Sequence, residues 1–157
     1  LTLRGLDGVI RPVLAAAKIP AGNAPTDHMR LGGLAAPVDL ATGRLGPAVR
    51  KSDATFVARC ERHPDTGARI DGFVLPCWEA VLGLAVRAHA TLGRIVVVGW
   101  DLAILEDGPV IIEGNDNPGH SSSQLPGGIA LGETPVVPTV ATMLRDVFAR
   151  PAGASGR

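Results

Sequence analysis

The fold of this chain is decided by the stretch VVVGWDLAILEDGPVIIEGNDNPG, residues 96–119, in which acidic side chains stand at the ends of two apolar runs. The runs cover residues 95–105 and 109–115, are rich in Val and Ile, and are separated by Glu106-Asp107-Gly108. A three-residue connection that ends in glycine suits a hairpin turn with a bulge. The stretch therefore predicts an antiparallel β-hairpin.

A turn centred on Asp107 would set the register of this hairpin. The expected cross-strand pairs are Leu105 with Pro109, Ala103 with Ile111, and Asp101 with Glu113. Because successive side chains of a strand point to opposite faces, apolar and polar residues should separate. One face is expected to carry Leu102, Ile104, Val110 and Ile112, and the other Asp101, Glu113 and Asn115.

The polar face of the hairpin predicts a cation site. Directly opposed residues have Cα atoms about 4.5–5.5 Å apart, so two carboxylates held there repel unless a cation lies between them. Mg²⁺ prefers hard oxygen ligands, and Asp101, Glu113 and Asn115 supply two carboxylates and an amide oxygen. The alternative is a surface hairpin whose polar face is simply hydrated.

Helices and strands are also expected outside the hairpin. Apolar residues recur at helical spacing after Pro76, and Gly93 is placed to end that helix. A second helix is expected to begin near Pro138 and to carry one apolar stripe. The stripe consists of Val140, Met143, Leu144, Val147 and Phe148. The serines at 121–123 indicate a loop, and residues 150–157 a disordered tail.

Turns and an edge strand are predicted in the first half of the chain. Residues 9–18 favour an extended edge segment interrupted at Pro12, after a turn at residues 6–8. Residues 39–43 and the HPDTG motif at 63–67 have the composition of turns. Together these elements predict an α+β fold in which an antiparallel sheet is backed by two helices.

Composition excludes several classes of function. Fifteen basic and fifteen acidic residues among 157 cancel, so no net positive field attracts nucleic acid or an anionic membrane. No apolar run approaches the roughly 20 residues that cross a bilayer, and we expect a cytoplasmic protein. Cys60 and Cys77 are too few for a disulfide scaffold and are expected to be reduced. A zinc site that combines them with His63 and His89 lacks a compact ligand pair.

The residues around the hairpin carry a resemblance to a known family. The pattern GWD-x-AI, then DGPVIIEGNDNPG, closely resembles the metal-binding hairpin of ATP-grasp domains, and in particular the sugar-transfer-associated branch related to the alpha-L-glutamate ligases. TLR at the start, Gly32-Gly33, VDLATG, HPDTGARIDG and LPCWE resemble further landmarks of that branch. The resemblance covers about residues 2–148.

The resemblance implies an ATP-dependent enzyme. In ATP-grasp enzymes, residues matching Asp101, Glu113 and Asn115 hold the Mg²⁺ or Mn²⁺ ions that bridge the phosphates of ATP. Such enzymes form an acylphosphate from a carboxylate, and an amine or another nucleophile then attacks it. We therefore expect ATP and a small carboxylate or a sugar-linked molecule as partners. Residues 1–149 would form only the carboxyl-terminal lobe of the fold, so that an amino-terminal ATP-grasp lobe is a further expected partner.

Further site residues follow from the matching segments. Arg4, Lys18 and Arg30 are candidate phosphate contacts, although each could equally be a solvated charge. His63 and Asp65 in the HPDTG turn, and Asn117 beyond the hairpin, are candidate substrate contacts. His120 has the same standing as Asn117. The leading hypothesis is an ATP- and Mg²⁺-dependent carboxylate ligase, and the alternative is a non-catalytic relic or binding module.

Overall fold

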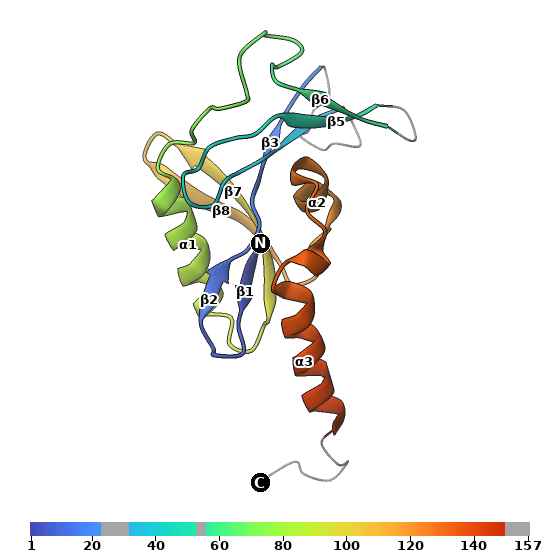
Figure 1. The fold of residues 1–157 in the computed structure, drawn as a ribbon. Coiled ribbons are helices and arrows are strands. Elements are labelled where there is room, and N and C mark those ends of the chain that lie inside the picture. Colours follow the sequence, from blue (N-terminus) through green and yellow to red (C-terminus); the bar gives the residue numbers. More distant parts are fainter. Residues whose placement is uncertain (23–31, 53–55, 150–157) are drawn as a thin grey trace.

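The chain folds into two four-stranded antiparallel sheets with three α-helices among residues 1–22, 32–52 and 56–149, which are the residues that the computed structural model describes (Figure 1). The first sheet has the order β2-β1-β7-β8, formed by Ile10–Pro12, Thr2–Arg4, Val97–Leu105 and Gly108–Asn115. The second has the order β3-β4-β5-β6, formed by Ala16–Ile19, Leu34–Pro37, Ala48–Ser52 and Phe56–Cys60. The expected mixture of helices and antiparallel strands is confirmed, but one sheet was expected where the structure has two.

The extended segment after the first turn belongs to both sheets. β2 is an edge strand of the first sheet and β3 is an edge strand of the second, with residues 13–15 connecting them. Pro12 is the last residue of β2, a position where proline's missing N–H removes no central ladder bond. The predicted edge strand with an interruption at Pro12 is thus confirmed. The interruption is the point at which the chain passes from one sheet to the other.

Helix α1, Trp78–Ala90, packs against the first sheet. Its buried residues are Val81, Ala85 and His89, spaced by four as one face of a helix requires. The helix expected after Pro76 is therefore confirmed. In Figure 1, α1 and α3 lie to opposite sides of β1 and β2.

Two expectations about the carboxyl-terminal helices are wrong. Residues 121–123 begin a short helix, α2 (Ser121–Gly127), which packs on the second sheet, where the serines predicted a loop. The helix expected to begin near Pro138 is confirmed as α3 (Val136–Ala149), but it makes its main contacts with the 3₁₀ helix Leu131–Glu133 and does not back a sheet as expected. The far end of its apolar stripe is therefore exposed, and Phe148 keeps 82% of its surface accessible.

The predicted turns are present. Gly8 and Gly67 have φ values of 77° and 70°, which glycine adopts without strain. In the turn at 39–43, Gly43 N donates to Asp39 O at 2.8 Å and Thr42 N donates to the Asp39 carboxylate at 2.8 Å. The second sheet has its own hydrophobic core. The core consists of Ala21, Leu34, Ala36, Val38, Leu45, Ala48 and Ile70.

Candidate functional site

The hairpin formed by β7 and β8 places Asp101 directly opposite Glu113, as predicted. The turn is shorter than expected, because β7 ends at Leu105 and β8 begins at Gly108. Near the turn, each predicted pair is therefore wrong by one residue. The observed pairs there are Leu105 with Gly108, Ile104 with Pro109, Ala103 with Val110, and Leu102 with Ile111.

A β-bulge at Ile112 places Asp101 and Glu113 opposite each other. The register shifts between Asp101 and Leu102, so that Ile112 has no partner on β7. Had the register near the turn continued, Asp101 would face Ile112, and Glu113 would lie on the other side of the sheet. The extra residue restores the pairing of Asp101 with Glu113.

The polar face of the hairpin is formed as predicted, but the apolar face is smaller. Asn115 pairs with Gly99, which shares a face with Asp101, so all three oxygen-bearing side chains lie on one side of the sheet. The placement of Val110 and Ile112 on the apolar face is wrong. Val110 pairs with Ala103 on the polar side, and the bulged Ile112 is 70% exposed.

The counter-charge to Asp101 comes from the other sheet. Lys18 Nζ, on β3, donates to both carboxylate oxygens of Asp101 at 2.9 Å each. The side chains remain 29% and 41% exposed, so water still reaches the pair. The structure thus brings together a predicted phosphate-contacting lysine and a predicted metal ligand.

The donor set fits a divalent cation. Two carboxylates and one ammonium leave a net charge of about −1, and Glu113 and Asn115 are exposed. Among the described residues no group of three or more His, Cys, Asp or Glu side chains could hold a metal ion, so a three-ligand site here needs the Asn115 amide as its third donor. Oxygen donors of this kind suit Mg²⁺ better than Zn²⁺.

Two glycines allow close packing at the carboxylates. An added Cβ at Gly114, between Glu113 and Asn115, would lie 2.6 Å from the Trp100 ring. An added Cβ at Gly99 would lie 2.4 Å from Pro118, just beyond the hairpin. The EGN triplet and the chain that follows it therefore depend on glycine at both positions.

Arg4, a second candidate phosphate contact, is not brought to this pair. Arg4 N donates to Val96 O at 2.8 Å, and Asp101 lies five residues farther along the strand, about 16 Å away. The Arg4 guanidinium donates to His89 O at 3.3 Å and to Ile95 O at 3.4 Å, beside the carboxyl end of α1. Arg30 lies outside the described residues.

His63 and Asp65 connect the HPDTG turn by hydrogen bonds to the segment that follows β3. The Asp65 carboxylate accepts a hydrogen bond from Gly22 N at 2.6 Å, and His63 Nε2 lies 2.8 Å from Pro20 O. His63 Nδ1 accepts from two backbone N–H groups of its own turn, so Nε2 carries the proton and donates to Pro20. Asn117 is exposed in the connection between β8 and α2.

His89, considered above only for a zinc site, is a polar residue of the interior whose burial was not expected. His89 is fully buried in α1, between the helix and the first sheet, and both its ring nitrogens make hydrogen bonds. The recurrence of Val81, Ala85 and His89 at intervals of four was a signal that this histidine faces the core. Its bonding leaves no nitrogen for the zinc site considered above.

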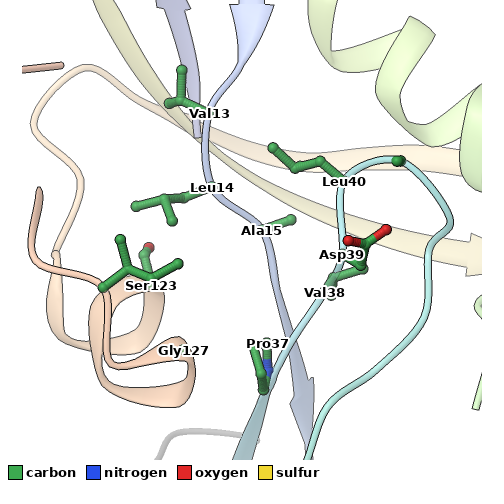
Figure 2. Close-up of a pocket in the computed structure, with 11 residues that line it drawn as sticks. Val13, Leu14, Ala15, Pro37, Val38, Asp39, Leu40, Ser123 and Gly127 are labelled. Carbon is green, nitrogen blue, oxygen red and sulfur yellow. The ribbon is translucent and has the colours of Figure 1, made fainter. Parts of the chain in front are cut away.

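An apolar hollow of about 400 Å³ lies away from the carboxylates. Figure 2 shows Leu14 and Ala15 on the chain between the sheets, with α2 on one side and the turn at Asp39 on the other. The Asp39 carboxylate is bonded to Thr42 of its own turn, and neither Asp101 nor Glu113 lines the hollow. We assign it no role.

No helix among residues 1–22, 32–52 and 56–149 combines the length and the apolar character that a bilayer span requires.

Comparison with known proteins identifies the family. No curated protein and no solved structure shows significant similarity to the chain. The model of the sugar-transfer associated ATP-grasp family matches residues 7–136, a span that includes the hairpin, Lys18 and the HPDTG turn. The chain therefore belongs to the sugar-transfer associated ATP-grasp family, as the resemblance predicted.

Proposed function

We propose that this chain carries the metal-binding part of an ATP- and Mg²⁺-dependent ligase that activates a carboxylate as an acylphosphate. Membership of the ATP-grasp family indicates ATP-dependent, ligase-type activity. The observation that carries the proposal is the cross-strand pair of Asp101 and Glu113, with Asn115 on the same face of the hairpin. Like charges on directly opposed residues of a hairpin favour a bound cation.

Asp101, Glu113 and Asn115 would hold Mg²⁺ or Mn²⁺. Such an ion, when bound with ATP, neutralises phosphate charge and favours transfer of the γ-phosphoryl group to a carboxylate. The role of the hairpin is to fix three oxygen donors in one place before the nucleotide arrives, so that little order has to be gained on binding.

Lys18 has two roles in this proposal. Without metal, its ammonium is the counter-ion of Asp101. A partly exposed ion pair is worth only about 0–1 kcal/mol, so a divalent cation can displace the lysine from the carboxylate at little cost. Lys18 would then be available to donate hydrogen bonds to the phosphate oxygens of ATP.

The substrate is proposed at the level of chemical class. A small carboxylate or a sugar-linked carboxylate fits the family description. His63, Asp65 and Asn117 are proposed substrate contacts, supported by their position in matched segments. Both ring nitrogens of His63 already make hydrogen bonds within the protein, so neither is free to bind a substrate. His63 would therefore contribute by holding the HPDTG turn in position.

Calorimetric titration tests the metal assignment. We expect the chain to bind Mn²⁺ and Mg²⁺-ATP, and Glu113→Gln and Asp101→Asn to weaken both by about tenfold or more. Glu106→Gln is the matched control, because it removes a carboxylate from the turn of the same hairpin. Equal affinities in the Glu113 and Glu106 variants would overturn the assignment.

A second measurement addresses turnover. The chain is mixed with Mg²⁺-ATP and a panel of amino acids and uronic acids, and ADP release is followed. Release that depends on one carboxylate and is lost in Glu113→Gln supports the ligase. Binding of Mg²⁺-ATP without release by any member of the panel favours the non-catalytic binding module.

A further inference from the structure

A buried chain of hydrogen bonds runs from helix α1 to the strand that carries Asp101. Trp100 Nε1 donates to Thr2 Oγ1 at 2.8 Å, and Thr2 Oγ1 lies 2.8 Å from His89 Nδ1. His89 Nε2 lies 3.0 Å from Ile95 O. Thr2 and His89 are 2% and 0% exposed, so the bond between them is shielded from water.

The direction of two of these bonds follows from the chemistry of the groups. A carbonyl oxygen only accepts, so His89 Nε2 carries a proton and donates to Ile95. His89 Nδ1 lies within hydrogen-bond distance of the Thr2 hydroxyl, which joins the imidazole to β1. The Thr2 oxygen accepts from the indole N–H. The Thr2 hydroxyl also lies 3.5 Å from Val98 O on the neighbouring strand, so its oxygen is held between β7 and α1 and gives the indole N–H of Trp100 a fixed acceptor.

The Trp100 ring touches both halves of the proposed metal site. Trp100 precedes Asp101 in β7 and lies directly opposite Gly114 in β8. The approach is so close that an added Cβ at Gly114 would lie 2.6 Å from ring carbon Cζ3. The position of the ring therefore sets how the backbone between Glu113 and Asn115 lies relative to Asp101.

We propose that His89 is a positioning residue that acts through Thr2 and Trp100 to hold Asp101, Glu113 and Asn115 in register. This inference rests on the proposed metal-binding function of the hairpin. A buried polar network stabilises a fold no better than apolar packing of the same shape, so its value lies in the single orientation that it specifies. Substitution of residues that orient the metal ligands without touching the metal commonly weakens metal binding by about 10–100-fold.

Substitutions at Thr2 separate orientation from packing. Thr2→Val keeps the shape and removes the hydroxyl, whereas Thr2→Ser keeps the hydroxyl. We expect Thr2→Val to weaken Mn²⁺ binding by about tenfold, Trp100→Phe to do the same, and Thr2→Ser to retain binding. The double variant Thr2→Val/Trp100→Phe should bind no more weakly than either single variant, because both break the same chain.

Val81→Ala is the control for general destabilisation. Val81 is buried in α1 and takes no part in the chain of bonds. This variant should lower the melting temperature, while the Mn²⁺ affinity of the folded protein stays within about twofold of the wild type. Unchanged Mn²⁺ affinity in Thr2→Val, or an equal loss in Val81→Ala, would overturn the positioning role.

A readout without metal separates this inference from the proposed function. Backbone amide NMR spectra of the metal-free protein report the environment of residues 113–115. We expect these signals to shift or broaden in Thr2→Val and to stay in place in Thr2→Ser. If the wild type binds no Mn²⁺ but Thr2→Val shifts the signals of residues 113–115, the proposed function is wrong and the positioning role of the hydrogen-bond chain is supported. If the signals do not move, the positioning chain fails.

Discussion

Lys18 Nζ lies 2.9 Å from each carboxylate oxygen of Asp101, and this contact joins the two sheets at the candidate site. Lys18 belongs to an edge strand of the second sheet and Asp101 to an inner strand of the first. A cation therefore already neutralises one of the two carboxylates. The question for function is whether this lysine competes with a metal ion or assists it.

Removal of the lysine should act in opposite directions on metal and nucleotide. In Lys18→Gln, Asp101 loses its counter-ion, so Mn²⁺ alone should bind more tightly, by up to about 5-fold for an ion pair worth about 1 kcal/mol. Mg²⁺-ATP should bind more weakly, because a proposed phosphate contact is lost. Titration calorimetry measures both. Arg94→Gln removes an equal charge at an exposed position and is the control. A change of the same sign for both ligands would contradict the dual role.

The register of the hairpin can be checked by cross-linking. In a Cys60→Ser/Cys77→Ser background, the pair Ala103→Cys/Val110→Cys should oxidise readily, because these positions lie opposite each other. The pair Ala103→Cys/Ile111→Cys should stay reduced, because its side chains point to opposite faces and cannot meet disulfide geometry. Alkylation of free thiols followed by mass measurement distinguishes the two. Efficient oxidation of the second pair would mean that the bulge is absent.

The hairpin was predictable because its signals are local. Two apolar runs and a short acidic turn specify antiparallel pairing. The bulge was not predictable, because the run from Val110 to Ile112 is uniformly apolar and gives no sign of which residue lacks a partner. The predicted carboxylate pair is right although the predicted turn is wrong. The shorter turn and the added bulge change the register by one residue each, in opposite directions.

Contacts between distant parts of the chain were beyond the sequence. Lys18 and Asp101 are 83 residues apart, and their meeting depends on how the second sheet is placed on the first. Helix α2 contains Pro126 and three serines, which disfavour a helix, so its packing on β3, β4 and β5 overrides its local preference. His89, in contrast, was within reach of a helical-spacing argument.

Gly114 should tolerate no side chain. In Gly114→Ala the new methyl group would overlap the Trp100 ring, so the ring or the strand must shift. Such overpacking costs about 1–3 kcal/mol, which a denaturant titration will measure as a lower midpoint. Mn²⁺ affinity should fall as well. Gly119→Ala is the matched control, since an added Cβ there meets no atom within 4 Å. Equal midpoints for the two variants would show that the ring does not constrain the triplet.

Acid should weaken two turns that carboxylates stabilise. A hydrogen bond from Arg11 lowers the pKa of Asp7 to about 2, and hydrogen bonds from Thr42 lower the pKa of Asp39. Both folded-state pKa values lie below the ordinary value of 3.8, so the stabilisation is present above about pH 4 and is lost as the pH falls toward 2. Urea midpoints at pH 5, 3 and 2 should therefore fall less steeply in Asp7→Asn than in the wild type. Arg11→Gln should flatten the same curve, because without its partner the Asp7 carboxyl titrates closer to its unfolded value. Parallel curves for all three proteins would mean that the Asp7–Arg11 pair contributes nothing to folding in solution.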